Sequence, residues 1–268
     1  MEPNSESPSL PGRPLTLGVV RYLNTRPLDA ALAERPDVTL VPEVPSRLVE
    51  RFRAGELDAA LLPVMAWFEG VGAGIVRGLG IGSCGEVESV RLFCRRPLRE
   101  TRVVCLDAES LTSNALCRIL LRRAHGLAPE FATPTAAPAG ADAVLRIGDK
   151  AMMDDPEAVE IVDLGADWLR WTGLPFVFAA WIAREGVPAT PLVPILTQAL
   201  AAGLARLPEL AEAGARATGL DRGRCERYLS ERIRYRFGPE DEDGLARFGE
   251  EARREGLIPR VRPVRWLA

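Results

Sequence analysis

The sequence predicts an α/β fold of two lobes with a helical C-terminal region. Short apolar runs typical of buried strands alternate with segments of helical spacing between Leu15 and Val64, and the same rhythm restarts after Arg95-Arg96-Pro97. Such alternation is typical of parallel sheets with right-handed crossovers, so we expect each lobe to be a mainly parallel sheet flanked by helices. From Pro191 onward the pattern is helical throughout. A cleft between two lobes is a common place for a ligand.

In the first lobe, we expect strands at 15–20, 38–41 and 59–64, because each is an apolar run of strand length. The run at 59–64 is apolar throughout, which is typical of a strand buried on both faces. Helices are expected at 27–34, with Pro27 in the first turn, and at 47–54, which ends at Gly55 as a helix C-terminus commonly does.

In the second lobe, the pattern predicts strands at 103–106, 143–147 and 160–164, a helix at 112–124 and a short helix at 167–171. A further apolar strand is expected at 175–183, and helices follow at 192–217, 222–233 and 240–254. We expect the chain to cross between the lobes near 93–97 and 178–182. The predicted organisation is a disordered tail at 1–14, a first lobe of 15–95 plus 182–268, a second lobe of 96–181, and a ligand cleft between the lobes.

Composition excludes several classes of protein. The chain has 268 residues with 47% hydrophobic content, enough for a substantial core, and a net charge of −3, which gives no general attraction to nucleic acid. No apolar run reaches the roughly 18 residues of a membrane span, and the polar first fourteen residues lack the apolar core of a signal peptide. Five scattered cysteines without a C-x-x-C pair favour reduced thiols. We therefore expect a cytoplasmic protein, monomeric or homodimeric, without nucleic-acid or membrane partners.

Three short polar stretches are the most informative feature. They lie at 20–28, 82–90 and 107–114, each just after an apolar run. In open α/β sheets, ligands bind outside the carboxyl ends of strands, where helix-start amides favour anions. The stretches therefore predict a site for a small acidic molecule. From the residues alone, Asn24 and Ser110 can equally be ordinary helix N-caps.

Six motifs in register resemble the chorismate dehydratase family of the futalosine route to menaquinone: Tyr22-Leu23-Asn24-Thr25-Arg26-Pro27-Leu28, Gly55-Glu56-Leu57-Asp58-Ala59-Ala60-Leu61-Leu62-Pro63-Val64, Ser83-Cys84-Gly85-Glu86-Val87-Glu88-Ser89-Val90, Ser110-Leu111-Thr112-Ser113-Asn114, Ile147-Gly148-Asp149-Lys150-Ala151 and Trp171-Thr172-Gly173-Leu174-Pro175-Phe176-Val177-Phe178-Ala179. The resemblance covers about 15–184, and the C-terminal region more loosely. Members often carry Ser where this chain has Thr25. The resemblance implies a type II periplasmic-binding-protein-like fold used as a cytoplasmic enzyme, a hydro-lyase that converts chorismate to 3-[(1-carboxyvinyl)oxy]benzoate.

The resemblance also implies a set of site residues. Asn24 is expected to orient the reacting centre, and Glu86 is the candidate base, with Glu88 and Asp149 as alternatives. A carboxylate of the substrate is an equal candidate for taking the proton, since a protein carboxylate would repel a dianion. The expected substrate-binding residues are Tyr22, Thr25, Ser83, Cys84, Ser110, Thr112, Ser113, Asn114, Gly148, Asp149 and Trp171, with Trp181 as an alternative to Trp171.

No cofactor or metal is expected. The chain has no glycine-rich dinucleotide loop, no Walker loop and no His/Cys ligand set. Its one histidine, His125, is expected to cap the end of a helix. Aromatisation of the ring can drive the elimination without a redox cofactor. Two alternatives remain open. One is the paralogous enzyme acting on cyclic dehypoxanthine futalosine, and the other is a non-catalytic binding protein for a small carboxylate, for which a secretion signal or an anchoring cysteine near the N-terminus would be expected.

Overall fold

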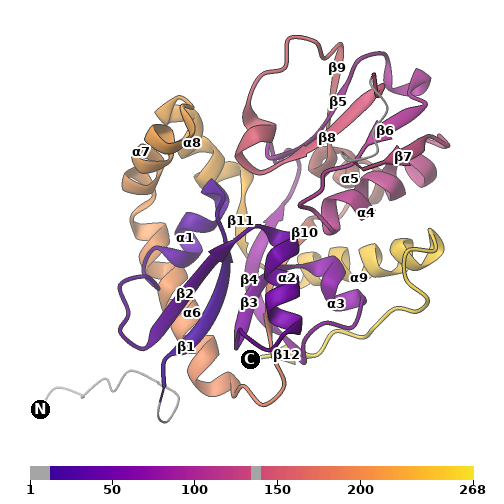
Figure 1. The fold of residues 1–268 in the computed structure, drawn as a ribbon. Coiled ribbons are helices and arrows are strands. Elements are labelled where there is room, and N and C mark those ends of the chain that lie inside the picture. Colours follow the sequence, from indigo (N-terminus) through magenta and orange to yellow (C-terminus); the bar gives the residue numbers. More distant parts are fainter. Residues whose placement is uncertain (1–12, 134–139) are drawn as a thin grey trace, which may run out of the picture.

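The computed structural model describes residues 13–133 and 140–268. The expected tail at 1–14 lies outside the described residues except for Arg13 and Pro14. Arg13 is held in place, since its guanidinium donates to both carboxylate oxygens of Asp58 at 2.7 and 2.6 Å. The described residues form two sheets, and Figure 1 shows them as two halves of the molecule stacked end to end.

The first sheet has seven strands within the described residues, in the order β11-β4-β10-β3-β1-β2, with β12 also paired to β4. We call this sheet and its helices the large half. Its strands are β1 (Leu15–Val20), β2 (Val38–Glu43), β3 (Ala59–Pro63), β4 (Gly74–Ser83), β10 (Phe176–Ala183), β11 (Arg234–Arg236) and β12 (Trp266–Leu267). Every residue of β3 is buried, as the continuous apolar run predicts.

The second sheet has five strands within the described residues, in the order β7-β6-β8-β5-β9, and with its helices it forms the small half. Its strands are β5 (Val90–Cys94), β6 (Val103–Cys105), β7 (Glu130–Ala132), β8 (Ala143–Ile147) and β9 (Glu160–Asp163). The expectation that each sheet is mainly parallel is wrong. β1 pairs parallel with β2 and β3, and β6 with β7 and β8, but β10 and β5 run antiparallel to both of their neighbours. These two strands follow the crossings between the sheets and enter from the opposite direction.

The crossings also lie earlier in the chain than expected. β5 belongs to the second sheet and β10 to the first, so the chain crosses at about 84–89 and again at 164–175 rather than near 93–97 and 178–182. The boundary predicted at 95 therefore falls just after β5, and the one predicted at 182 falls within β10, although each strand already belongs to the other sheet. The cause is that each crossing precedes its apolar strand, whereas the crossings were expected at the end of the first of these strands and within the second.

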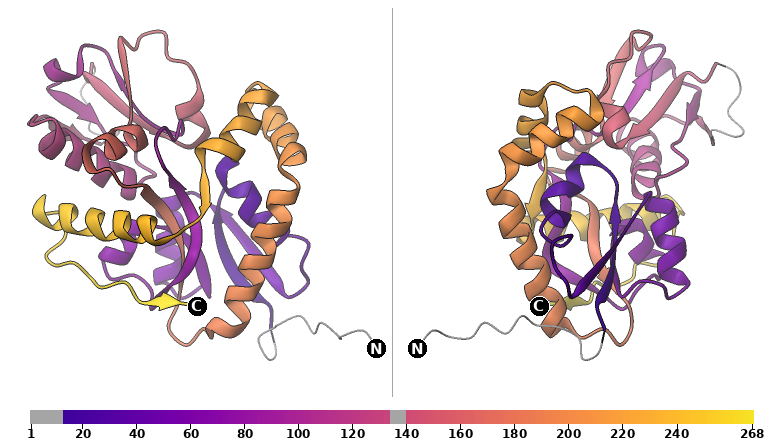
Figure 2. Two further views of the ribbon diagram at one scale, coloured as in Figure 1. Left: turned by 180° about the vertical axis from the view of Figure 1, so that it is seen from behind. Right: turned by 60° about the vertical axis from the view of Figure 1, so that its left-hand side comes forward.

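Helices cover both halves. They are α1 (Arg26–Asp29), α2 (Pro45–Arg53), α3 (Val64–Phe68), α4 (Thr112–Ile119), α5 (Leu164–Thr172), α6 (Ala189–Ala205), α7 (Leu207–Thr218), α8 (Arg222–Arg227) and α9 (Pro239–Arg254), with shorter helical turns η1 (Leu23–Thr25), η2 (Leu98–Glu100), η3 (Leu120–Ala124), η4 (Gly148–Met152) and η5 (Tyr228–Arg232). Figure 2 shows α6 and α7 along one flank and α9 running across to the small half. There, Glu251 of α9 accepts hydrogen bonds from Arg123, Arg247 and Arg254.

The helix expected at 192–217 is two helices that meet at an angle of 79°. Arg206 leaves the helical conformation, and Pro208 stands in the first turn of α7, where its missing N–H costs no hydrogen bond. Among the described residues, no single helix has both the length and the apolarity needed to cross a membrane, whereas the bent pair α6 and α7 meets these criteria by length and composition only.

Candidate functional site

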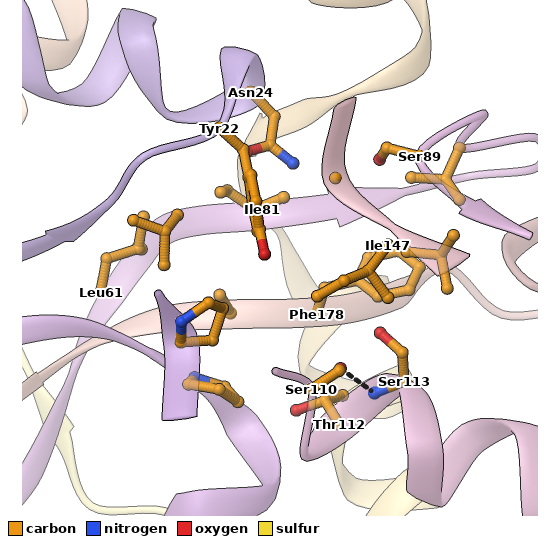
Figure 3. Close-up of a pocket in the computed structure, with 17 residues that line it drawn as sticks. Tyr22, Asn24, Leu61, Ile81, Ser89, Ser110, Thr112, Ser113, Ile147 and Phe178 are labelled. Atoms are coloured by element: carbon orange, nitrogen blue, oxygen red, sulfur yellow. Dashed lines mark hydrogen bonds between the residues drawn. The ribbon is translucent and has the colours of Figure 1, made fainter. Parts of the chain in front are cut away.

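A pocket opens where the two halves meet, at the ends of β1, β3, β5 and β8. It contains about 530 Å³ of empty space, part of it open to solvent. Its apolar wall includes Val20, Leu61, Ile81, Val90, Ile147 and Phe178. Its polar side chains are Tyr22, Asn24, Ser89, Ser110, Thr112 and Ser113. Figure 3 shows these groups converging on one space.

The start of α4 supplies three of the hydroxyl groups. Ser110 Oγ accepts the N–H of Ser113 at 3.1 Å, and Thr112 Oγ1 accepts the N–H of Met65, on the large half, at 3.1 Å. A hydroxyl that accepts from a protein N–H keeps its own proton for another acceptor. The first turn of the helix adds the partial positive charge of its free amides. The start of α4 is therefore suited to an anionic oxygen.

Asn24 enters the pocket from the opposite side, on the turn η1 that follows β1. The side chain is 8% exposed, and its Oδ1 accepts a hydrogen bond from Thr25 Oγ1 at 3.3 Å. The helical turns here have no side-chain cap, so Asn24 does not cap a helix. Because its oxygen is bound, the amide NH2 is the group that faces the pocket (Figure 3). Asn24 is placed as a hydrogen-bond donor.

Tyr22 and its neighbours join the two halves beside the pocket. The Tyr22 hydroxyl donates to Glu109 Oε2 at 2.8 Å, and burial, together with this carboxylate, raises the pKa of Tyr22. The N–H of Leu23 donates to Asp149 Oδ1 at 3.0 Å. Gly148 has φ +63°, and a Cβ there would lie 2.6 Å from the Tyr22 ring. Glycine at this position thus permits the close approach of the halves.

The crossing at 84–89 brings Ser89 to the pocket. Asp163 holds this segment, because its carboxylate accepts the N–H of Val87 at 3.1 Å and the N–H of Glu88 at 2.8 Å. Burial raises the pKa of Asp163, and these N–H groups act in the opposite direction. Glu88 has φ +58°, and its carboxylate accepts from Arg232 Nε at 2.9 Å. The ion pair accompanies a backbone conformation that is uncommon outside glycine.

Several residues predicted for the site lie outside the pocket lining. Glu86 has a side chain 54% exposed, with its carboxylate 3.3 Å from Arg232. Cys84 is exposed, and Ser83 is buried with its hydroxyl donating to Gly85 O at 3.1 Å. Trp171 packs edge-on against Trp168. Ile81 of β4 lines the pocket, and the next residue along the chain that does so is Val87. The stretch 83–86 between them is therefore outside the lining.

Three other predicted residues support the lining from behind. Thr25 is buried and binds the Asn24 amide, and Asn114 binds the backbone N–H and C=O of Asp107. Asp149 binds the Leu23 N–H rather than facing the pocket, and burial raises its pKa. Trp181, the alternative to Trp171, is fully buried in the core. By contrast, the structure brings six of the predicted residues together in the lining of one pocket: Tyr22, Asn24, Ser110, Thr112, Ser113 and Gly148.

The lining contains no carboxylate and no cationic side chain among the described residues. Glu86, Glu88 and Asp149, the candidate protein bases, all have partners elsewhere. No group of three or more His, Cys, Asp or Glu side chains in the described part of the chain has the arrangement of a metal site. His125 Nε2 lies 2.7 Å from Asp167 Oδ2, away from the pocket. The pocket is therefore a set of neutral donors on apolar walls.

Sequence reasoning missed Ser89 and much of the apolar wall. Ser89 stands just before β5, a strand that the sequence analysis did not recognise, and Ile81 lies in β4, which it also missed. The signal that could have found Ser89 is the mostly apolar run at 90–94 directly after the polar stretch. Phe178 was expected in the strand 175–183, but its place in the wall follows from the antiparallel position of β10 between β3 and β4.

The chain is similar in sequence to a known family and in fold to several solved structures. Residues 15–254 match the family model described as menaquinone biosynthesis. The chain is 33% identical to a chorismate dehydratase of Thermus thermophilus over 89% of this chain and 95% of that protein. A solved structure from Archaeoglobus fulgidus superposes with a TM-score of 0.73 at 14% identity, covering 93% of this chain and 100% of the other. The periplasmic aliphatic sulphonate binding protein SsuA of Escherichia coli gives 0.60 at 16% identity, covering 96% and 94%.

The two solved structures are distant in sequence and establish the fold alone, which confirms the expected periplasmic-binding-protein-like α/β architecture. The family model and the Thermus relative both span most of the chain, and the motifs quoted above lie within the matched range. The chain therefore belongs to the menaquinone biosynthesis family, together with the chorismate dehydratase of Thermus thermophilus.

Proposed function

We propose that this protein is a chorismate dehydratase, a carbon–oxygen hydro-lyase that converts chorismate to 3-[(1-carboxyvinyl)oxy]benzoate. The observation that carries the proposal is the 33% identity to a chorismate dehydratase over nearly the full length of both chains. The pocket supports it, because its neutral donors and apolar walls suit a small ring with carboxylate and hydroxyl groups. The five free cysteines support a reducing compartment, and we propose the cytoplasm.

The reaction removes the C3 hydrogen and the C4 hydroxyl of chorismate as water. The electrons of the C3–H bond form the new ring double bond, the C4–O bond breaks, and the departing oxygen gains the proton. The ring becomes aromatic, which supplies the driving force. What the protein must do is bind two carboxylates, hold the leaving hydroxyl and keep the proton acceptor near C3.

We assign the carboxylate at the small half to the start of α4, where Ser110 and Thr112 have protons free to donate. Asn24, across the pocket, donates to the leaving hydroxyl as its C4–O bond lengthens. A donor that binds more tightly as charge develops lowers the barrier rather than KM. The two halves act as lobes that bring these groups together around the substrate.

The proton acceptor in this proposal is a carboxylate of chorismate itself. The lining supplies no carboxylate from the described residues, and the acidic candidates are engaged elsewhere. A substrate carboxylate held over C3 makes the transfer intramolecular, and such positioning can supply about 7–11 kcal/mol. The walls formed by Ile81, Ile147 and Phe178 are apolar and offer water no hydrogen-bond partner beside this contact.

The test is incubation of purified protein with chorismate and detection of the enolpyruvyl benzoate by mass spectrometry. The assay contains EDTA and no nucleotide, because no cofactor is expected, and Asn24→Ala serves as the matched control. Unchanged chorismate with wild-type protein would contradict the proposal. Conversion of cyclic dehypoxanthine futalosine instead would favour the paralogous activity, and binding without turnover would favour a binding protein. Activity that EDTA removes and a divalent ion restores would contradict the cofactor-free mechanism.

A further inference from the structure

Glu88 has a backbone conformation that no other non-glycine residue adopts in the described part of the chain, with φ +58°. The N–H of Ser89 donates to Val87 O at 2.7 Å, so Glu88 is the central residue of a three-residue turn. A turn of this kind with positive φ at its centre is the rare and strained form of the γ-turn. Such strain persists only where the surroundings hold it, and it is concentrated at functional sites.

The turn forms part of the pocket. Val87 and Ser89, the residues on either side of Glu88, both line it, whereas Glu88 does not. Ser89 is 1% exposed, and its Oγ has no hydrogen-bond partner among the described residues. Figure 3 shows this hydroxyl directed toward the space between the labelled side chains. Because burying a hydroxyl without a partner costs free energy, Ser89 is suited to donate to a bound ligand.

Backbone contacts attach the turn to the small half. Asp163 accepts the N–H of Glu88 at 2.8 Å, and the N–H of Gly148 donates to Ser89 O at 2.9 Å. These contacts hold the peptide groups on either side of Glu88. They leave the conformation at the centre of the turn to the Glu88 side chain.

Three arginines surround the Glu88 carboxylate. Arg232 Nε donates to Oε1 at 2.9 Å and Arg224 Nε to Oε2 at 3.4 Å, while Arg91 lies 3.9 Å from Oε2. Burial acts to raise the pKa of Glu88, but the arginines hold it below its ordinary value. Hydrogen bonds between charged groups are stronger than those between neutral ones. The charged carboxylate thus attaches the centre of the turn to α8 and η5, which carry Arg224 and Arg232.

We propose that Glu88 is a positioning residue: its carboxylate, anchored by Arg232 and Arg224, holds the turn in its left-handed conformation and thereby keeps Ser89 Oγ directed at an oxygen of the bound substrate. The inference rests on the proposed function, because it assigns a further residue to that same site. Glu88 itself touches no substrate. Without the anchor, the centre of the turn relaxes toward the negative φ that glutamate prefers, and Ser89 loses its direction.

The experiment compares two neutral amides at position 88. Glu88→Gln and Glu88→Asn both remove the charge, but asparagine adopts positive φ more readily than glutamine. We expect Glu88→Gln to lower kcat/KM about tenfold and Glu88→Asn to recover at least about threefold of that loss. Steady-state kinetics measure both, with circular dichroism and thermal denaturation to check folding. A folded Glu88→Gln with unchanged kcat/KM would overturn the proposal. So would a Glu88→Asn no faster than Glu88→Gln, the result expected if the carboxylate itself took the proton.

Glu86→Gln is the matched control. Glu86 lies two residues away and its carboxylate is 3.3 Å from the same Arg232, but it belongs neither to the turn nor to the pocket lining. We expect this variant to keep kcat/KM within about twofold of the wild type. A loss equal to that of Glu88→Gln would show that the arginine matters rather than the turn, and would overturn the proposal.

A double variant tests whether the effect passes through the serine. If it does, Glu88→Gln combined with Ser89→Ala is no slower than Ser89→Ala alone, whereas multiplied losses would show independent action and overturn the proposal. The two proposals fail in different ways. Wild-type protein that leaves chorismate unchanged contradicts the proposed function, whereas active wild type with an equally active Glu88→Gln contradicts only the role of Glu88.

Discussion

The starts of η1 and of α4 face the same pocket, but their polar side chains differ in what they do for the fold. At α4, Ser110 binds the N–H of Ser113 in the first helical turn, and Thr112 binds the N–H of Met65. At η1, Asn24 caps no helix, and its oxygen binds only the neighbouring Thr25. The serine and threonine thus have structural tasks that would justify their presence without any ligand, whereas the asparagine does not.

This difference shows how structural and functional roles can be separated. A residue used by both the fold and the ligand loses stability and binding together when it is replaced. A residue that serves the ligand alone loses activity while the fold remains intact. The following predictions test that separation, from the largest expected effect to the smallest.

The largest effect is expected at Asn24. Asn24→Ala should lower kcat at least about a hundredfold, far more than it raises KM, because the amide donates mainly to the departing oxygen. Asn24→Asp keeps the size but adds a negative charge beside a dianion, so it should be at least as damaging. Steady-state kinetics, with circular dichroism to check folding, measure both. A folded Asn24→Ala with kcat within about threefold of the wild type would make Asn24 a structural residue and remove the contrast.

At α4, Ser110→Ala and Thr112→Ala should each raise KM about ten- to hundredfold, because a charge-assisted hydrogen bond contributes roughly 1.5–3 kcal/mol. Ser110→Ala should also destabilise the protein by about 1 kcal/mol, since it removes the acceptor for the Ser113 N–H. Denaturant titration beside the kinetics separates the two effects. Unchanged KM in both variants would place the carboxylate elsewhere.

A buried carboxyl behind η1 predicts a pH effect on stability. Asp29, 3% exposed, has its pKa raised to about 7 by burial, although Arg26 lies 3.0 Å away and acts in the opposite direction. The folded state therefore keeps a proton that the unfolded chain releases near pH 4, and this stabilisation is lost as pH rises from about 4 to 7. Asp29→Asn should flatten this fall, measured as unfolding free energies at pH 5 and pH 8. An equal change in unfolding free energy between pH 5 and pH 8 in the variant and the wild type would contradict the raised pKa of Asp29.

The smallest effect is expected at Glu86, which the sequence analysis placed among the catalytic residues. Its carboxylate is half exposed and paired with Arg232 outside the pocket lining, so Glu86→Gln should leave kcat and KM within about twofold of the wild type. The comparison with Asn24→Ala is direct, since both come from polar stretches that the sequence analysis treated alike. A loss of tenfold or more would return Glu86 to the catalytic machinery.

The strand-and-helix rhythm was predictable wherever apolar runs were uninterrupted, as in β1, β3 and β10. β4 escaped notice because glycine occupies four of its ten positions, which dilutes the strand pattern. The structure gives the reason for two of them. A Cβ at Gly80 would lie 2.3 Å from Ala179 O, and one at Gly82 would lie 2.8 Å from Phe176 O, so glycine permits β10 to lie this close. Composition alone cannot distinguish such a strand from a loop.

The site was predictable at strand ends followed by a helical turn, because that junction fixes which way Asn24, Ser110 and Thr112 face. It was not predictable at 83–86, where the chain changes sheets. There the direction of each side chain depends on distant contacts, such as Asp163 with the N–H groups of Val87 and Glu88. Trp171 lies outside the pocket lining for a related reason, since its ring packs against Trp168 and against Arg247, which is a distant contact of the same kind.

The contact between Gly148 and the Tyr22 ring has a consequence for evolution. The glycine has a backbone conformation that side chains disfavour, and any Cβ there would meet the ring at 2.6 Å. A mutation of the glycine is therefore tolerable only in a background where the tyrosine has already been replaced by a smaller residue. Tyr22 and Gly148 are far apart in the chain, as is the neighbouring hydrogen-bonded pair Leu23 and Asp149, whose separation is 126 residues. The tyrosine and the glycine should change together across related sequences or not at all.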